Sequence, residues 1–356
     1  MTDPRRAGAL LTIDLGAIVA NWRGLAGRLA PGATCAAVVK ADAYGLGAER
    51  VAPALLAAGC RHFFVATLDE GIALRPLLHG ADLFVLNGPP PGCEPDFAAN
   101  GLIPVLNDPG QVERWPGGPC ALHVDTGMNR LGIPVADFAR VVEARPNLAP
   151  ALVMSHLACA DEDGPMNEAQ RQAFASAAAQ LPGVPASLAA SSGIFLGNGY
   201  HFDLVRPGAA LYGVNPRPGQ PNPMAQVVRL QGKILQLRDV DSPMTVGYGA
   251  THRVTGRCRL ATVAIGYADG YPRSLSNRGF GVIGEWRVPI VGRVSMDLTI
   301  FDISEVPEAL AAPGSLIELI GADVTVDDVA EAAGTIGYEV LTRLGRRHHR
   351  VHVTGS

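Results

Sequence analysis

The sequence predicts an α/β protein in which a (β/α)8 TIM-type barrel is followed by a mainly β C-terminal domain. Two observations carry this prediction. Between residues 14 and 225, short β-rich runs alternate with longer alanine-rich stretches of helical period, and after a proline-rich segment at 215–223 the pattern becomes mainly β. A chain of 356 residues is also too long for one ordinary core, so two domains are expected.

The barrel prediction rests on eight strand candidates in the first part of the chain. They are 36–39, 63–66, 83–86, 103–105, 120–124, 151–154, 186–188 and 204–205. Helices are predicted between them, including 15–29, where Ile18, Trp22 and Leu25 share one face, and 168–181. The same runs would also allow an open doubly wound sheet.

The C-terminal domain is predicted at 226–356, after a barrel at 14–225. Its β-rich runs are 227–237, 259–265, 281–283, 288–291 and 297–303, and its one clear helical stretch is 326–333. A short apolar run at 8–13 precedes the first helix. It can pair with the C-terminal domain or with the barrel, and the sequence alone does not decide between them.

Charge and composition exclude several classes of protein. The net charge is −4 and basic residues are scattered up to 343–350, which argues against a nucleic-acid binder. No run is long enough to span a bilayer, and Asp14 interrupts the only candidate for a signal segment. The six cysteines show no paired short spacing, so reduced thiols are expected. We therefore expect a cytoplasmic protein with a small-molecule substrate, no nucleic-acid or membrane partner and no metal site.

The most informative local feature is Lys40, which ends the apolar run at 35–39 and precedes Ala-Asp-Ala-Tyr-Gly-Leu-Gly at 41–47. Burying an unpaired ammonium inside a strand is expensive, whereas barrels mount catalytic groups at the carboxyl ends of their strands. A lysine at that place can form a Schiff base. Taken alone, a lysine after an apolar strand is more often a solvated strand end.

The segment 37–47 resembles the pyridoxal-phosphate attachment segment of bacterial alanine racemases. Three further segments match the same family in order, around Arg130 (124–132), Arg206 (203–213) and Tyr267 (264–271), so the resemblance covers nearly the whole chain. It implies a fold-type III barrel with pyridoxal 5′-phosphate on Lys40. It also implies interconversion of L- and D-alanine by two bases, with Lys40 on the D face and Tyr267 on the L face.

The resemblance implies roles for the other matched residues. Arg206 would donate to an unprotonated pyridine nitrogen, because an arginine does not give up its proton at working pH, and the weakened electron sink disfavours transamination. Arg130 would lie near the cofactor O3′ and the substrate carboxylate. Tyr267 is a weak base that needs a donating neighbour, and His156 with Arg206 can form that relay. The matched phosphate contacts are Tyr44, Ser191 and the Gly208 amide.

Three positions depart from the family pattern. Ala190 precedes Ser191 where an asparagine is common. Arg346 stands where the family often has a phosphate-binding tyrosine, and an arginine can also bind the dianion. His123 stands where many members carry a carbamylated lysine that orients the residue matched by Arg130. Imidazole does not form that stable carbamate, so we expect no carbamylated lysine and a different acceptor for Arg130.

A homodimer with shared active sites is a further implication. In the family, the tyrosine matched by Tyr267 comes from the other subunit of a head-to-tail dimer, and a two-fold axis completes both sites together. The same crossing role falls on Met296, whose segment 292–297 resembles the one that lines the substrate pocket near the carboxylate.

Other interpretations stay open at this stage. Taken alone, Arg206 would make a surface ion pair, Tyr267 and His156 would be turn and strand-end residues, and Met296 would be strand core. A racemase of broader amino-acid range fits the same motifs. A decarboxylase of related fold uses an acidic group at the pyridine nitrogen, and a non-catalytic pyridoxal-phosphate-binding protein generally lacks the second domain. The motifs do not reveal whether D-alanine serves peptidoglycan synthesis or alanine is catabolised.

Overall fold

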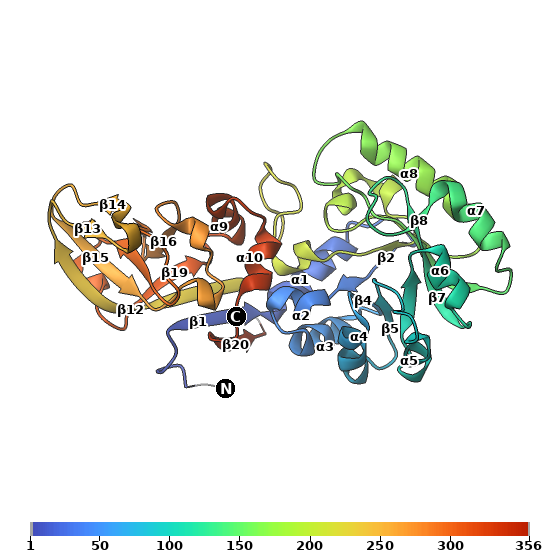
Figure 1. Cartoon of the computed structure of the whole chain (residues 1–356), viewed down its shortest axis with the longest axis horizontal. Coiled ribbons are helices and arrows are strands. Elements are labelled where there is room, and N and C mark those ends of the chain that lie inside the picture. Colours follow the sequence, from blue (N-terminus) through green and yellow to red (C-terminus); the bar gives the residue numbers. More distant parts are fainter. Residues whose placement is uncertain (1–2, 355–356) are drawn as a thin grey trace. The chain divides into compact units, whose positions relative to one another are not determined.

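The computed structural model describes residues 3–354, which divide into two compact units (Figure 1). The barrel unit consists of Ile18–Leu211 and Asn215–Met224. The β unit consists of the remaining described residues.

The barrel unit is built on parallel strands that run in the order β10-β9-β7-β6-β5-β4-β3. The strands are β2 (Thr34–Cys35), β3 (Ala37–Val38), β4 (His62–Val65), β5 (Asp82–Val85), β6 (Ile103–Leu106), β7 (Pro119–Asp125), β8 (Ile133–Pro134), β9 (Ala149–Met154), β10 (Ala186–Ser187) and β11 (Leu204–Val205). β2 pairs in parallel with β11, and a parallel bridge joins Ala190 to Arg206. These pairings connect the two ends of the sheet, so the predicted barrel is confirmed over the open sheet, and each of the eight predicted strands overlaps an observed one.

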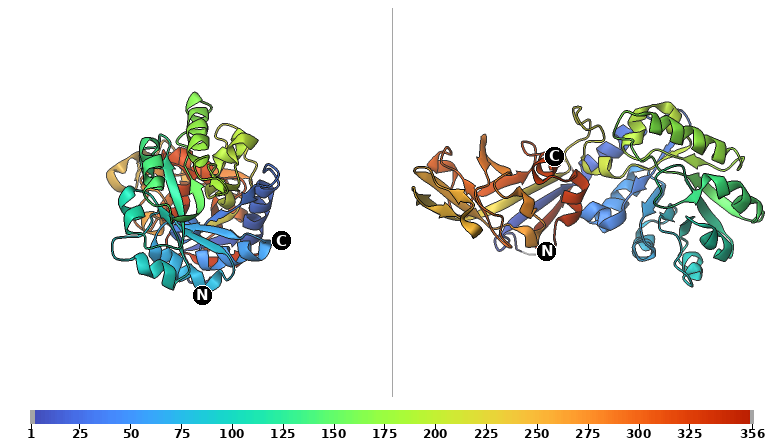
Figure 2. Two further views of the ribbon diagram at one scale, coloured as in Figure 1. Left: turned by 90° about the vertical axis from the view of Figure 1, so that its right-hand side faces the viewer. Right: turned by 45° about the horizontal axis from the view of Figure 1, so that its top comes forward.

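Helices lie outside these strands, as Figures 1 and 2 show. They are α1 (Leu15–Ala26), α2 (Lys40–Gly45), α3 (Ala48–Ala58), α4 (Leu68–Leu74), α5 (Glu94–Ala99), α6 (Pro109–Arg114), α7 (Val135–Glu143) and α8 (Pro165–Ala178). The helix predicted to reach residue 29 ends at Ala26, because Gly27 follows and glycine is a weak helix former. The helix predicted from 168 starts at Pro165, a favoured first residue.

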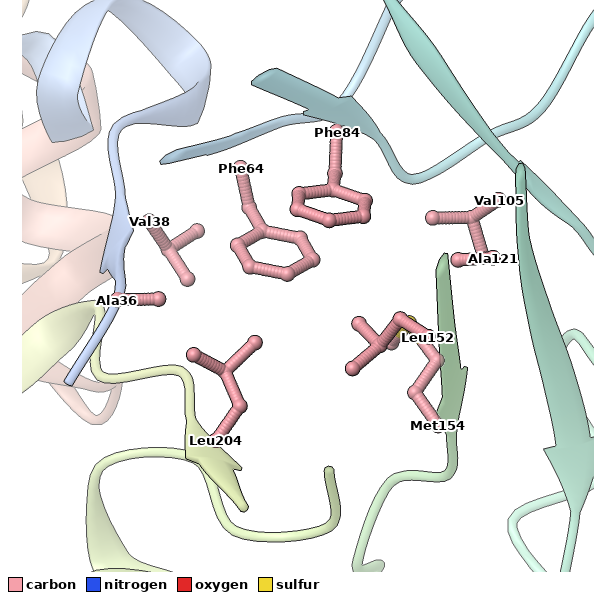
Figure 3. Packing of buried hydrophobic residues seen from close by; sticks show 9 residues of the cluster. All are labelled: Ala36, Val38, Phe64, Phe84, Val105, Ala121, Leu152, Met154 and Leu204. Carbon is pink, nitrogen blue, oxygen red and sulfur yellow. The ribbon is translucent and has the colours of Figure 1, made fainter. Parts of the chain in front are cut away.

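An apolar core fills the barrel. Figure 3 shows its side chains converging from separate strands; they are Ala36, Val38, Phe64, Phe84, Val105, Ala121, Leu152, Met154 and Leu204. Phe64 and Phe84 stack with ring centroids 4.6 Å apart. The side chain of Tyr44 packs against this cluster from the turn that follows β3. Because the core is close-packed, the strand ends that carry polar residues are held in fixed register.

The β unit is organised around the long strand β12 (Val228–Val240). One path of its sheet runs β17-β16-β19-β12-β1-β20, and β15 and β18 continue from β12. The other elements are β1 (Ala9–Asp14), β13 (Thr245–Val246), β14 (His252–Arg253), β15 (Cys258–Val263), β16 (Phe280–Ile283), β17 (Trp286–Pro289), β18 (Thr299–Asp302), β19 (Leu316–Ile320), β20 (His349–Val353), α9 (Val326–Ala333) and α10 (Gly337–Arg343). β1 pairs antiparallel with β12 and parallel with β20. The predicted mainly β character of this domain is confirmed.

Two further observations complete the fold. The six cysteines lie within the described residues and form no disulfide, and Cys35, Cys60 and Cys120 are buried. Among residues 3–354, no helix has the length and apolar content needed to cross a membrane.

Candidate active site

The residues singled out in the barrel gather at one rim. Their positions lie at or just beyond the carboxyl ends of strands: Lys40 after β3, Arg130 after β7, His156 after β9, Ser191 after β10, and Arg206 and Gly208 after β11. Parallel strands present the same end to one side of a barrel, so residues up to about one hundred and seventy positions apart in sequence share this rim. The charges of Lys40, Arg130 and Arg206 all act on His156.

Lys40 is half-buried at the start of an unusual turn. The four residues after it, Ala41–Tyr44, all have left-handed backbone angles, with φ from 53° to 56°. Burial lowers the pKa of the Lys40 amine, the charge of Arg130 lowers it further, and Glu70 opposes both. A lowered pKa leaves more of the amine neutral, which suits a nucleophile or a base.

Arg206 is buried, with 3% of its surface exposed. Its guanidinium donates to the hydroxyl of Ser187, to the Ser155 carbonyl at 2.6 Å and to the Leu188 carbonyl at 3.4 Å. No carboxylate within residues 3–354 forms an ion pair with it. Burial lowers the pKa of Arg206 to about 9, which still leaves it cationic at neutral pH. The alternative of a surface ion pair is therefore wrong, and the buried cation is suited to an electron-rich neutral ligand atom.

Two histidines of the rim are held in the neutral form. Burial, reinforced by Arg206 and Arg130, lowers the pKa of His156 to about 3. Burial and the same two arginines lower the pKa of His123 to about 4. Neutral imidazoles can pass a hydrogen bond without adding a charge.

The tautomer of His123 follows from its neighbour Asn107. The Asn107 amide nitrogen donates to the carbonyls of Leu86 and Val105, both at 2.9 Å, so its oxygen is left to accept. His123 Nδ1 lies 2.8 Å from that oxygen and must donate to it. In the neutral ring, Nε2 then keeps a lone pair.

A donor cluster suited to phosphate lies at the ends of β10 and β11. The Ser191 hydroxyl oxygen accepts from the N–H groups of Gly208 at 3.0 Å and Ala210 at 3.1 Å, so the hydroxyl proton remains to be donated. A Cβ built on Gly208 would lie 2.3 Å from the Tyr44 hydroxyl, so only glycine lets the phenol approach this backbone. Hydroxyl, phenol and backbone N–H groups are the donors that phosphate dianions use.

Arg130 is exposed and follows a loop built on one carboxylate. Asp125 Oδ1 accepts from the N–H groups of Gly127 and Met128 at 2.9 Å and of Asn129 at 3.1 Å. Thr126 Oγ1 lies 2.8 Å from Ser155 Oγ, which ties the loop to the end of β9. The loop therefore fixes the backbone from which Arg130 projects.

In the β unit, Tyr267 and Met296 form an exposed pair. They are 42% and 54% exposed, and the Tyr267 N–H donates to the Ser295 carbonyl at 3.0 Å. A Cβ on Gly266 would lie 2.3 Å from that same carbonyl oxygen, so glycine permits the close approach. The alternative of Met296 as strand core is wrong, because its side chain faces outward.

An arginine next to the predicted one stabilises this pair. Arg347 bridges Asp269 at 3.1 Å and Asp297 at 2.7 Å, which joins the turn of Tyr267 to the segment of Met296. Arg346 is exposed, and its assignment to the phosphate stays a prediction.

Comparison with known proteins identifies the family. The profile of the alanine racemase N-terminal domain matches residues 13–216, and that of the alanine racemase C-terminal domain matches residues 227–352. The chain belongs to the alanine racemase family.

Relatives match over nearly their full length. Alanine racemase of Rhodospirillum rubrum is 58% identical, over 97% of this chain and 96% of the relative. A catabolic alanine racemase of Mesorhizobium japonicum is 51% identical, over 98% and 94%. A crystal structure of alanine racemase from Bartonella henselae with covalently bound pyridoxal phosphate is similar with a TM-score of 0.93 and 40% identity, over 98% of this chain and all of that one.

Four residues that contact the groups of this site are not among those that the sequence predicts. Asn107 and Ser187 contact His123 and Arg206, and Glu70 and Arg347 contact Ala41 and Asp269 of the matched segments. Only Glu70 carries a local signal, because Thr67-Leu68-Asp69-Glu70 has the spacing of a capping box, which the structure forms at α4. The contact of Glu70 with the Lys40 turn has no such signal.

Proposed function

We propose that this protein is an alanine racemase that interconverts L- and D-alanine with pyridoxal 5′-phosphate bound covalently to Lys40. The observation that carries the proposal is a half-buried lysine of lowered pKa at the same barrel rim as a buried arginine that has no carboxylate partner among residues 3–354. The family membership supports the reaction, and the Bartonella henselae relative with covalently bound pyridoxal phosphate supports the cofactor.

The two bases act on opposite faces of the substrate. When bound, the cofactor acidifies the Cα–H bond of the amino acid. Lys40 holds or takes the proton at its Nζ atom on the D face. The partner subunit's Tyr267 does so at its phenol oxygen on the L face. Removing the proton on one side and returning one on the other inverts the centre.

Arg206 sets the balance between racemisation and transamination. Its guanidinium stays cationic at neutral pH and donates, so a pyridine nitrogen placed against it remains unprotonated. By donating without giving up its proton, Arg206 would keep the bound cofactor a weak electron sink, which would favour return of the proton to the substrate Cα over its transfer to the cofactor. His156 is neutral and the charges of Arg206 and Lys40 both act on it, which supports its proposed role as a relay between this cation and the proton-transfer groups.

The remaining residues bind two anionic groups, the phosphate of the cofactor and the carboxylate of the substrate. The Ser191 hydroxyl and the Tyr44 phenol hold the phosphate, with Arg346 as a further cation. The Gly208 N–H, which donates to Ser191 Oγ in this structure, joins them by sharing its hydrogen bond with the phosphate. Arg130 binds the substrate carboxylate.

His123 orients the Arg130 side chain by accepting a hydrogen bond from it. Its Nε2 lone pair is the acceptor that this chain offers at the position where many family members have a carbamylated lysine. A neutral imidazole replaces an anion there, so no carbamylated lysine forms.

The protein acts as a homodimer in the cytoplasm. The exposure of Tyr267 and Met296 supports a role for this pair on a second subunit, because a monomer would leave two apolar side chains in water. The second candidate function is a racemase of broader range, which assays with serine, lysine and arginine distinguish from an alanine enzyme. Relatives of similar identity include both plain and catabolic alanine racemases, so both physiological roles fit this chain.

Borohydride reduction followed by peptide mapping tests the proposal. The chain contains only two lysines, Lys40 and Lys233, and the Lys233 ammonium donates to the carbonyls of Pro4 and Arg5. The reduced cofactor is expected on Lys40, together with loss of optical rotation from L-alanine before reduction. An adduct on Lys233, or none, contradicts the assignment.

A further inference from the structure

Glu70 has no part in the function proposed above, yet both of its carboxylate oxygens are used at the turn that carries Lys40. Oε1 accepts from the N–H of Ala41, the residue after Lys40, at 2.7 Å. Oε2 accepts from the N–H groups of Ala66 at 2.7 Å and Thr67 at 3.3 Å, at the end of β4. One side chain therefore connects the start of the Lys40 turn to the next strand of the barrel.

The turn needs such a connection because its backbone is unfavourable. Residues with a Cβ rarely adopt left-handed angles, and here four do so in a row. Within the turn, the Ala43 N–H donates to the Val39 carbonyl at 2.9 Å, and Asp42 Oδ1 accepts from the Ala48 N–H at 2.7 Å. Those hydrogen bonds fix the middle and the C-terminal end of the turn. The first left-handed residue, Ala41, is held by Glu70.

Glu70 also acts on the charge of the Lys40 amine. Arg130 in the loop after β7 and Glu70 in α4 influence this amine, and the amine in turn influences His156 after β9. Burial and Arg130 disfavour the ammonium, and the carboxylate of Glu70 favours it. The same side chain thus acts on the place of the amine and on its charge.

We propose that Glu70 is a positioning residue, which clamps the left-handed turn to the end of β4 and so keeps the Lys40 amine at one place above the barrel rim. The inference rests on the proposed role of Lys40. A glutamine is a direct test, because an amide has a single acceptor oxygen and its NH2 group would face backbone N–H donors.

The test uses the full chain freed of cofactor, so that it runs whether or not Lys40 binds pyridoxal phosphate. Trace acetic anhydride labels neutral amines, and mass spectrometry gives the ratio of label on Lys40 to label on Lys233, an internal reference in every sample. In Glu70→Gln, we expect this ratio at pH 7.5 to rise roughly threefold and the pH midpoint of Lys40 labelling to fall. Hydrogen exchange in the peptide 40–46 should quicken on the order of tenfold.

Two further variants separate the clamp from general effects on α4. Thr67→Ala breaks the capping box of α4 but keeps Glu70, so labelling and exchange at the Lys40 turn should match the parent. Glu70→Asp keeps the charge but is one methylene shorter, so exchange in 40–46 should quicken while the labelling midpoint stays near that of the parent.

The outcomes separate this inference from the proposed function. Three results would each overturn the positioning role. They are Lys40 labelling in Glu70→Gln that equals that of the parent, hydrogen exchange in both Glu70 variants that equals that of the parent, and a change of labelling or exchange in Thr67→Ala as large as in the Glu70 variants. A borohydride adduct away from Lys40 would overturn the function and leave the labelling result intact. If Glu70→Gln does not fold, Glu70→Asp and Thr67→Ala still decide the clamp through their exchange rates.

Discussion

The Gly208→Ala substitution tests the proposed phosphate site through a single methyl group. The new Cβ would lie 2.3 Å from the Tyr44 hydroxyl and 3.0 Å from Tyr44 Cζ. Ordinary contact begins near 3.4 Å, so the hydroxyl must retreat by roughly 1 Å. The tip of a side chain moves more easily than backbone, so we expect the tyrosine to swing away and the protein to lose about 1–3 kcal/mol of stability.

The displaced phenol would lose the hydrogen bond to the phosphate that we propose for it. A hydrogen bond to a charged group contributes about 1.5–3 kcal/mol, so the Kd for pyridoxal phosphate should rise roughly 10- to 100-fold. Titration of the cofactor-free chain, followed by absorbance, measures this Kd, and a thermal melt of each variant provides the stability control.

Tyr44→Phe is the matched background. It removes the hydroxyl that Gly208→Ala displaces, so adding Gly208→Ala to Tyr44→Phe should weaken binding by less than about threefold. Parental affinity in Gly208→Ala, or a full loss repeated in the Tyr44→Phe background, refutes the reasoning that Gly208 exists to admit the phenol.

Three other predictions concern pH, the subunits and the two bases. His123 has a pKa of about 4 in the folded chain against 6.5 as its ordinary value, so as the pH falls the unfolded state takes up a proton before the folded state does. The folded state should therefore lose about 3 kcal/mol of stability between pH 6.5 and pH 4. Urea unfolding measures this loss, which should be smaller in His123→Gln. Mixed Lys40→Ala and Tyr267→Phe chains should regain activity, because one of the two sites in each heterodimer is intact, and absence of recovery after verified subunit exchange would place both residues in one chain. Tyr267→Phe should slow single-turnover deuterium exchange from L-alanine far more than from D-alanine, and an equal loss in both directions would make Tyr267 structural.

Local pattern was sufficient for much of this molecule. The apolar runs of the barrel strands predict their places because a buried strand must be apolar along its length, and each predicted strand overlaps an observed one. The same logic places Lys40 and Arg206 at strand ends, where a charge can leave the apolar interior. Such features depend on residues that are neighbours in the chain.

Only the tertiary structure decided the contacts between distant residues. The run at 8–13 is apolar apart from Thr12 and would fit either sheet. Its pairing with both β12 and β20 depends on strands more than two hundred positions away. Glu70 meets Ala41 across 29 positions, Asn107 meets His123 across 16, and Arg347 joins Asp269 to Asp297. A local pattern predicts which side chains must be buried. The hydrogen-bond partner of a polar atom, in contrast, is fixed only when packing has placed every strand end. The supporting residues of this site could therefore be identified only from the tertiary structure.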